Sequence, residues 1–517
     1  MRLYSRFMSE IFRTPADYRA GPIGPIGMNV RRPDSLISPA RNGLPPAYLL
    51  LVLAIAVGSV LIRIPFFHVP MINDEGGYAY VAFFMSPDYQ VYRDIPFYRP
   101  QAIFYVYRLI FATIGTDVVA MRVFAALWNA ATVVCVFFLG LAVSSRQTAV
   151  ISAALFAVFS AGPSMEGFTA NAEIFAQLPI VLCALLAWKK SWAWAGLMAG
   201  LAVLLKPSGL SALLLAFTWV FVTGASVRGF ARVTGAFALT ILPSIVHGVW
   251  IGWEHYWESM VRGRAAYITP DSFSPAAQLR QLARGAMLSA PSWAIPAVLS
   301  VASVVRKIER PQQFAMLWLG ASFIGMAMGG FWFPHYFIQA LPPLALLAGL
   351  GIPALARSRM RWFWAAPIVV ATAIFARDLS LWSGAPEQIS LDLYGRPSYL
   401  FSAEAAQYVA ANTAPTDPIF VAFSQAEIYY LARRRASVPY MYYADFAYSQ
   451  HLFNEAINSI RGAEPAMVLV AQPPPASRMS WDQFMNVLSQ HYEQVRVLPA
   501  GPTDAGSILI FRRKPAS

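Results

Sequence analysis

The sequence predicts a helical membrane protein that crosses the bilayer many times and ends in a small soluble α/β domain. Of its 517 residues, 57% are hydrophobic and only 13% are charged, and the mean hydropathy of +0.49 exceeds that of ordinary soluble domains. A helix needs about 20 mostly apolar residues to cross a hydrocarbon core of roughly 30 Å. We expect about eleven such spans, near residues 45–66, 118–143, 147–163, 173–188, 191–205, 208–225, 233–252, 289–305, 312–331, 337–356 and 362–381.

Composition divides the chain into three parts. Residues 1–44 are rich in Pro, Gly and Arg and predict a disordered basic tail. Residues 45–384 hold the apolar stretches, and a long first loop at 67–117 contains two apolar pieces that are too short to cross, which predicts interfacial helices. Residues 385–517 lack long apolar runs.

Short β-type stretches alternate with helical ones in the last part of the chain. The β-type stretches are PIFVAF from Pro418, AMVLVA from Ala466 and SILIFRR from Ser507, and SAEAAQYVAANT from Ser402 has a helical pattern. The segment 385–517 is long enough to bury a core of its own. It therefore predicts a soluble α/β domain.

The net charge of +13 follows the membrane topology and does not indicate a nucleic-acid partner. The N-terminal tail carries seven arginines against three acids, and every second connection after it is short and basic. The positive-inside rule places the tail and these connections in the cytoplasm. The other loops and residues 385–517 then lie on the outer, periplasmic face. The basic connections contain Arg146; Lys189 and Lys190; Arg228 and Arg232; Arg306, Lys307 and Arg310; and Arg357, Arg359 and Arg361.

Several kinds of site have no signal in this sequence. The two cysteines, Cys135 and Cys183, fall inside predicted spans, so neither a disulfide framework nor a thiolate metal site is indicated. The six histidines are widely spaced and form no local metal-binding motif. The outer α/β region has no glycine-rich loop between a strand and a helix, so a nucleotide-bound donor is not expected.

Two adjacent carboxylates, Asp74 and Glu75, follow the first predicted span on its outer side. Partial desolvation near the headgroups raises the basicity of a carboxylate, and such a base can deprotonate a hydroxyl nucleophile. A single acid in a membrane loop is more often an ordinary loop charge. The interpretation therefore depends on the polar motifs that follow.

The order of segments over residues 45–356 resembles the integral-membrane GT-C glycosyltransferases. The similar branch is the PMT-like one, which includes protein O-mannosyltransferases and the enzymes that transfer aminoarabinose or galacturonic acid to lipid A. Asp74 and Glu75, in NDEGGYAY, match the acidic pair of the first outer loop in that family. Arg99, in RPQ, stands where the family has Lys-Pro-Pro, and so keeps the cation and one proline.

The resemblance continues at the outer ends of later spans. Glu173 in NAEIF, with Glu166 nearby, matches the second acidic site of the family, and Lys206 in LLKPSG matches the basic residue after the fifth span. His335 and Tyr336 stand where the family has Arg-Tyr before the tenth span. All of these residues fall on the outer side in the topology derived from the basic loops.

The resemblance implies a transferase that uses a polyprenyl-phosphate sugar as donor and inverts the anomeric carbon. The acceptor would be a hydroxyl of a cell-envelope glycan, of lipid A or of a protein, at the outer face of a bacterial inner membrane. Asp74 would be the base, and Glu75 beside it would be the second catalytic carboxylate. Glu75 and Glu173 would orient hydroxyls. Cations would stabilise the leaving phosphate. The expected substrate-binding residues are Arg99, Glu166, Glu173, Lys206, Arg262, Arg264, His335 and Tyr336.

The resemblance requires no cofactor. Some GT-C enzymes bind a divalent metal, but no motif in this sequence indicates one.

Other interpretations of these residues and of the chain remain open. Lys206 alone fits a snorkelling lysine at a span end, and Arg262 and Arg264 fit headgroup anchors. The alternative function is a transporter or flippase of lipid-linked glycans, which would place ionisable residues near mid-span. A third interpretation, a scaffold whose outer domain does the work, leaves so many spans unexplained.

Overall fold

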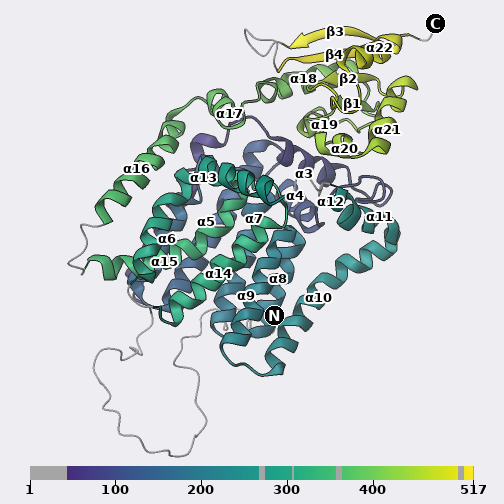
Figure 1. Cartoon of the computed structure of the whole chain (residues 1–517). Coiled ribbons are helices and arrows are strands. Elements are labelled where there is room, and N and C mark those ends of the chain that lie inside the picture. The colour runs from purple at the N-terminus through teal and green to yellow at the C-terminus, as the bar shows by residue number, and fades with distance from the viewer. Residues whose placement is uncertain (1–43, 267–273, 306–307, 357–363, 499–505, 516–517) are drawn as a thin grey trace, which may run out of the picture.

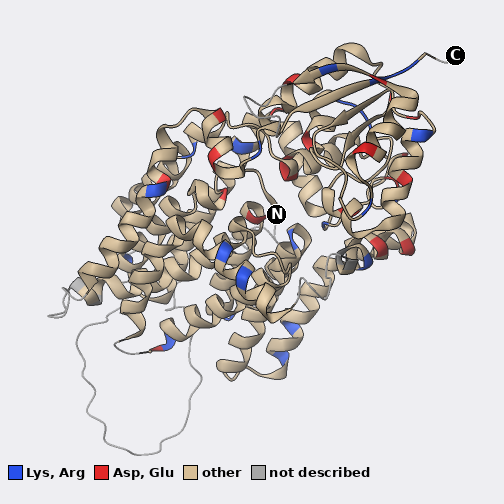
Figure 2. Ribbon diagram, turned by 45° about the horizontal axis from the view of Figure 1, so that its top comes forward, with Lys and Arg blue, Asp and Glu red and all other residues tan. Residues whose placement is uncertain are grey.

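The computed structural model describes residues 44–266, 274–305, 308–356, 364–498 and 506–515, so the predicted tail at 1–44 lies almost entirely outside the described residues. A thick layer of packed helices forms most of the molecule, and a smaller α/β unit covers one end of it (Figure 1). Most of the helical ribbon is free of charged residues, which gather at helix ends and in the α/β unit (Figure 2). This distribution is the one expected for helices surrounded by lipid.

The helical layer runs from α2 to α16. Its α-helices are α2 (Pro46–Leu61), α3 (Asn73–Phe84), α4 (Ala102–Thr113), α5 (Val118–Val143), α6 (Arg146–Phe159), α7 (Ala172–Trp188), α8 (Trp192–Leu205), α9 (Leu210–Val222), α10 (Val227–Ile251), α11 (Trp253–Trp257), α12 (Gly263–Ala266), α13 (Pro275–Val304), α14 (Arg310–Ala327), α15 (Leu341–Ala356) and α16 (Ala365–Leu379). Three short segments bear on the site: the 3-10 helices η3 (Pro163–Met165) and η6 (Pro334–Ala340) and the π-helical η5 (Glu258–Arg262).

Each predicted span coincides with a helix. Within the described residues, six helical stretches are long and apolar enough to cross a membrane by length and composition. The remaining predicted spans correspond to α6, α7, α8, α9 and α14, of which the first four belong to shorter apolar helices. The six stretches are Pro46–Phe66, Val118–Val143, Val227–Ile251, Pro275–Val304, Pro334–Pro353 and Ala365–Ser383.

The first loop contains the two short helices that the sequence predicts, α3 and α4. Their position relative to the lipid interface stays a prediction. α3 begins directly before the acidic pair, which therefore lies in its first turn. Carboxylates are favoured there because the unpaired N–H groups give a helix N-terminus a partial positive charge.

The C-terminal unit is built on a four-stranded sheet of order β1-β2-β4-β3. The strands are β1 (Ile419–Ala422), β2 (Met467–Val470), β3 (Tyr492–Leu498) and β4 (Ile508–Arg513), and the helices are α17 (Pro386–Tyr394), α18 (Ser398–Asn412), α19 (Ala426–Ala432), α20 (Tyr443–Tyr448), α21 (Gln450–Arg461) and α22 (Trp481–His491). β1 and β2 are parallel, and the other two pairs are antiparallel. The predicted strands appear as β1, β2 and β4.

α19 of the C-terminal unit packs directly against α3, the helix that carries the acidic pair. The backbone N–H of Ala426 donates to Asn73 Oδ1 at 2.6 Å, and the backbone N–H of Ala436 donates to the Tyr80 hydroxyl at 3.0 Å. A Cβ atom at Gly76 would lie 2.2 Å from the Cα atom of Glu427, so only glycine permits this approach. Gly76 therefore allows the C-terminal unit to pack against the first turns of α3.

Replacing Gly76 with alanine should loosen this junction. The added methyl group meets the backbone of Glu427, which cannot move aside as a flexible side chain does, and overpacking of this kind costs about 1–3 kcal/mol. We expect Gly76→Ala to lower the thermal unfolding midpoint and to speed proteolysis after α16. The matched control is Gly58→Ala in α2, where the new Cβ meets nothing within 4 Å; equal behaviour of the two variants would contradict the close approach.

The buried carboxyl of Glu427 should make the stability of the C-terminal unit depend on pH. Ser402 donates a hydrogen bond to Glu427 Oε1 at 2.7 Å, while Oε2 is buried without a partner among the described residues. Burial raises the pKa of Glu427 to about 8. The folded state therefore holds a proton that the unfolded state releases near its ordinary pKa of 4.5, so the free energy of unfolding should fall as pH rises from about 4.5 to 8.

The slope of that fall is at most about 1.4 kcal/mol per pH unit, and stability should level off above pH 8. Thermal unfolding of the wild type and of Glu427→Gln from pH 5 to 9 measures this dependence of stability on pH. The variant should lose the pH dependence across this window. A wild-type midpoint that rises with pH over the same window would show that the carboxyl is ionised in the fold.

Candidate active site

Asp74 presents an uncommitted carboxylate at the junction of the two units. It is half-buried in the first turn of α3, and within the part of the chain that the structure describes it makes no ion pair and no side-chain hydrogen bond. The phenol of Tyr78 lies one turn further along the helix, and burial, followed by the charge of Asp74, raises its pKa above the ordinary range. Asp74 is thus an acceptor with free capacity beside a neutral phenol.

The carboxylate of Glu75, in contrast, is paired and hydrogen-bonded inside the protein. Arg122 of α5 donates from Nε to Oε1 at 3.0 Å and from Nη2 to Oε2 at 2.7 Å, and both side chains are 0% exposed. The backbone N–H groups of Ala170 and Ile72 also donate to the carboxylate, at 2.9 and 3.3 Å. This geometry favours a positioning role for Glu75 over direct contact with a substrate.

Arg122 also donates hydrogen bonds to the backbone at the end of the first span. Its Nη1 donates to the carbonyl oxygens of Phe66 at 3.0 Å and of Phe67 at 3.3 Å, and also to that of Val69. The guanidinium therefore ties the chain leaving α2 to α3 and α5. A buried arginine with a fixed set of donors holds such a junction in one geometry.

Glu173 and Lys206 meet at the ends of two antiparallel helices. Glu173 lies in the first turn of α7, where Asn171 caps the helix by accepting the backbone N–H of Ala172 at 2.9 Å. α8 ends at Leu205 because the following Lys206 precedes Pro207, which disfavours helical backbone, and Lys206 is extended, with φ −154° and ψ 136°. The two side chains form an ion pair and are only 5% and 8% exposed.

His335 joins this pair to Glu166. Its Nε2 lies 3.3 Å from Glu173 Oε1, and its Nδ1 lies 3.2 Å from Glu166 Oε1. Next to it, the ring of Tyr336 lies under the ammonium group of Lys206, with 4.0 Å from Nζ to the ring centroid. Five expected substrate-binding residues from four separate segments therefore form one cluster.

Glu166 occupies a strained position held from outside the cluster. Its backbone is left-handed, with φ 54° and ψ 31°, which is unfavourable for a residue with a side chain. The preceding turn is fixed by Asp378 of α16, which accepts hydrogen bonds from Ser164 at 3.0 Å and Ser292 at 3.1 Å. These contacts hold the acid in a conformation that it would not adopt alone.

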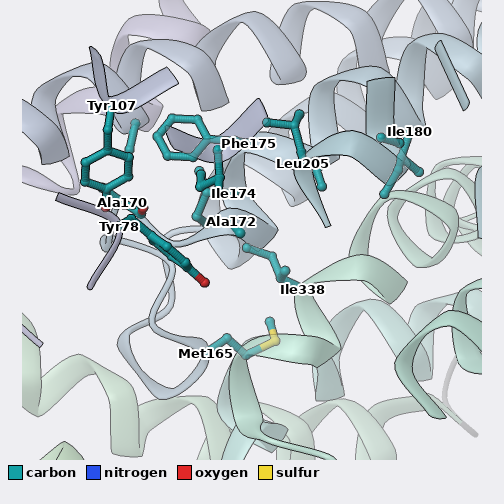
Figure 3. Close-up of a cluster of buried hydrophobic side chains, with 14 of the residues drawn as sticks. Tyr78, Tyr107, Met165, Ala170, Ala172, Ile174, Phe175, Ile180, Leu205 and Ile338 are labelled. Carbon is teal, nitrogen blue, oxygen red and sulfur yellow. Dashed lines mark hydrogen bonds between the residues drawn. The ribbon is translucent and has the colours of Figure 1, made fainter. Parts of the chain in front are cut away.

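An apolar cluster lies between these segments and brings them together (Figure 3). In the sequence, Met165 precedes Glu166, Ala172 and Ile174 flank Glu173, and Leu205 precedes Lys206. Each charged residue is thus a direct neighbour of a buried apolar one. Burial of the apolar side chains is the favourable term, and it sets the positions of the charges. The labelled members are Tyr78, Tyr107, Met165, Ala170, Ala172, Ile174, Phe175, Ile180, Leu205 and Ile338.

Arg99 links Asp74 to the cluster around Lys206. Its Nε donates to the Tyr78 hydroxyl at 3.3 Å, and its Nη1 donates to the carbonyl oxygen of Tyr98 at 3.1 Å. Burial opposes the charge of the guanidinium, but Tyr78, Asp74 and Tyr336 outweigh it and leave its pKa above the ordinary value. The Tyr78 hydroxyl in turn donates at 3.4 Å to Oδ1 of Asn171, the residue that caps the helix of Glu173, so the base candidate and the cation cluster belong to one site.

The two arginines expected from the 253–288 loop differ from the rest. Arg262, in η5, is exposed and forms ion pairs with Glu254 and, at 3.7 Å, with Glu258. It lies in this surface network, and among the described residues it forms no ion pair or hydrogen bond with the cluster of Lys206. The side chain of Arg264 lies outside the described residues.

Three residues that the sequence did not indicate belong to the site. Arg122 is a charge inside a predicted span, a signal that a search for buried pairs can use, and Tyr78 lies one helical turn after Asp74. Tyr442 comes from the C-terminal unit, and a Cβ at Gly77 would lie 2.0 Å from its hydroxyl oxygen. Nothing in its local sequence marks it.

The described residues hold no group of three or more His, Cys, Asp or Glu side chains arranged to bind a metal ion. Of the two carboxylates around His335, Glu173 is paired with Lys206, a cation of the protein itself. Lysine and arginine donate hydrogen bonds and have no lone pair to offer a metal, so Lys206 and Arg99 are groups that can contact an anion.

Comparison with solved structures shows the fold. The chain is similar to ArnT from Cupriavidus metallidurans, both bound to undecaprenyl phosphate and in the apo state, with a TM-score of 0.63 and 14% sequence identity in each case. Each alignment covers 90% of this chain and 98% of ArnT. The chain therefore has the polytopic GT-C fold.

A weaker likeness, to the oligosaccharyltransferase of Archaeoglobus fulgidus, has a TM-score of 0.49 at 13% identity and covers 81% of this chain and 69% of that one. This likeness is too weak to support a conclusion about the chain. No protein-family model and no curated sequence matches the chain.

Removing one partner of the Glu75–Arg122 pair should unfold the region around the site. Arg122→Met leaves a buried carboxylate without its counterion, which costs about 3–5 kcal/mol. We expect the unfolding midpoint to fall sharply, and Glu75→Gln combined with Arg122→Met to recover part of the loss. The control is Glu404→Gln, which breaks an exposed pair with Arg496 and should change stability by about 1 kcal/mol or less. A stable Arg122→Met variant would contradict the positioning role.

Proposed function

We propose that this protein transfers a sugar from a polyprenyl-phosphate donor to a hydroxyl acceptor, with inversion at the anomeric carbon. The observation that carries the proposal is the uncommitted carboxylate of Asp74 beside a buried, cation-bearing cluster at one end of the helices. Support comes from the fold, which is shared with a protein solved with undecaprenyl phosphate bound.

The cation cluster fits the leaving group. A polyprenyl phosphate leaves as an anion, so it needs charge stabilisation and no proton. Lys206 and Arg99 supply two cations, one from the end of α8 and one from the first loop. In the described structure Lys206 is paired with Glu173, and we propose that the donor phosphate takes over that contact while Glu173 turns to the hydroxyls of the sugar.

Asp74 fits the acceptor side. The acceptor oxygen attacks the anomeric carbon as its proton passes to the Asp74 carboxylate, and the bond from that carbon to the phosphate oxygen breaks with its electron pair. Attack opposite the leaving group inverts the configuration. Glu75 and Arg122 hold the first turn of α3, and therefore Asp74, in place for this step.

The orientation in the membrane follows as part of the proposal. α7 begins next to Glu173 and ends at Trp188, directly before Lys189 and Lys190, so the basic turn and the site lie at opposite ends of one helix. The positive-inside rule then gives the site and the C-terminal unit an outer location in a bacterial inner membrane. The acceptor is a component of the cell envelope.

Transport of a lipid-linked glycan fits the structure less well. A transporter carries its ionisable residues near the middle of the membrane, at the interface between repeats. Here Asp74 and Glu173 begin helices and Lys206 follows the end of one. The charges therefore lie at one face of the helical layer, where a reaction between a lipid donor and an outer acceptor takes place.

Asp74→Asn should abolish transfer while leaving the donor bound. Loss of a general base typically lowers the rate by about 10²–10⁴-fold, and asparagine keeps the size of the side chain. The assay is sugar transfer by purified protein from a synthetic undecaprenyl-phosphate sugar. The control is Asp88→Asn, an exposed acid of the same loop, which should keep wild-type activity; an Asp74→Asn variant of equal activity would exclude Asp74 as the base.

A further inference from the structure

Besides α19, residues 440–445 of the C-terminal unit reach the site. Tyr442 is fixed there by two contacts: its hydroxyl oxygen abuts Gly77, where a Cβ would lie 2.0 Å away, and its ring meets that of Phe97 at 5.5 Å and 79°. Asp445 holds the segment from behind by accepting the backbone N–H of Tyr442 at 3.0 Å. This segment is therefore a fixed wall of the site.

Among the described residues, the hydroxyl of Tyr442 is an unsatisfied polar group next to the first turns of α3. Its oxygen is buried and has no hydrogen-bond partner among the described residues. The charges that act on it are those of Asp74 and Arg99, together with the phenol of Tyr78. A buried hydroxyl without a partner costs free energy, and a ligand that hydrogen-bonds to it recovers that cost next to the proposed base.

A second pair of phenols continues the wall away from Asp74. Tyr98 packs on Gly263, where a Cβ would lie 2.0 Å from the Tyr98 ring, so α12 closes on it from the other side. Burial, followed by Asp445, Tyr440 and Glu258, raises the pKa of Tyr98. Burial and the carboxylates of Glu455, Asp445 and Glu258 raise that of Tyr440 to about 12. Both phenols are neutral at physiological pH and lie near the same two carboxylates.

The wall leads to a pocket on α21. Ser437 and Val438, three and two residues before Tyr440, line a pocket of about 410 Å³ together with Glu455, a volume within the range of small-molecule sites. His451, Asn454 and Asn458 lie three and four residues apart, on the same face of the helix as Glu455, and line it too. Helical residues at this spacing are neighbours, so the pocket offers amide, imidazole and carboxylate groups side by side.

We propose that the wall formed by Tyr442, Tyr98 and Tyr440, together with the pocket on α21, binds the sugar units of the acceptor, so that the acceptor is a glycan. This inference rests on the proposed function and names its acceptor class. Phenol rings give flat apolar faces against which the C–H faces of a sugar pack, and carboxylates and amides pair with its hydroxyls.

The charges of the wall disfavour an acidic acceptor. Asp445 lies behind the wall, and Glu455 and Glu464 line the pocket. Arg262 is already paired with Glu254 and Glu258. A phosphate or carboxylate on the acceptor would be repelled at close range. A neutral or amine-bearing sugar is accepted, and the anionic donor phosphate is confined to the side of Lys206.

Acceptor kinetics test the inference. Purified full-length protein is given an undecaprenyl-phosphate sugar together with a neutral trisaccharide, the same trisaccharide carrying a phosphate, or a serine- and threonine-containing peptide. We expect transfer to the neutral trisaccharide only. Tyr440→Ala should raise the KM for this acceptor about tenfold and leave kcat and the donor KM unchanged. Tyr440→Phe, which keeps the ring, should recover most of the affinity.

Two controls keep the outcomes distinct. Tyr448→Ala removes an exposed tyrosine at the end of α20, outside the segment 440–445, and should leave the acceptor KM unchanged. Binding of undecaprenyl phosphate shows that each variant is folded. Transfer to the peptide instead of the trisaccharide, or an unchanged acceptor KM in Tyr440→Ala, overturns the glycan acceptor while the proposed function stands. A wild type that neither binds undecaprenyl phosphate nor consumes the donor overturns both.

Discussion

The buried ion pair between Glu75 and Arg122 is the interaction on which the site depends. Both groups are removed from water, which is costly for isolated charges, and the pair is stable because nearly every donor and acceptor is matched within the protein. The same guanidinium binds the carbonyl oxygens at the end of the first span. One interaction therefore sets the exit of α2, the first turn of α3 and the start of α5 relative to one another.

α3 has a different task on each of its faces. On one face Glu75 binds Arg122, on another Gly76 contacts the backbone of Glu427, and between them Asp74 has no ion pair or side-chain hydrogen bond with any described residue. The charged residues around Lys206 are positioned differently, by the apolar side chains next to them in sequence (Figure 3). Polar contacts therefore position Asp74, and apolar packing positions the charged residues around Lys206. The C-terminal unit covers the site.

Much of the fold was predictable because it depends on local properties of the sequence. Hydropathy predicted all six stretches of the described residues that are long and apolar enough to cross a membrane, while the other five predicted spans coincide with helices that do not meet both conditions. The strands β1 and β2 are buried at every position, so an uninterrupted apolar run predicts them. β3 was missed because the exposed polar residues Glu493, Gln494 and Arg496 interrupt its apolar residues, and its pairing with β4 makes it a strand. The extended backbone of Lys206 was equally local, since a proline follows it.

The site was predictable only in part, for the same reason. The order of motifs named Asp74, Glu166, Glu173, Lys206 and His335, and the structure brings the last four together. The order of motifs placed Glu75 against hydroxyls of the substrates, because the interaction that pairs Glu75 inside the protein comes from Arg122, 47 residues away. It did not indicate Tyr442, whose place depends on the docking of α19 on α3.

The most direct measurement of the central claim is the affinity of the purified protein for undecaprenyl phosphate, with and without the ammonium group of Lys206. If this cluster holds the donor phosphate, the wild type binds the lipid, Lys206→Met weakens binding by about tenfold or more, and the exposed-lysine variant Lys514→Met binds as the wild type does. Binding that is absent in the wild type, or equal in all three proteins, would contradict the account.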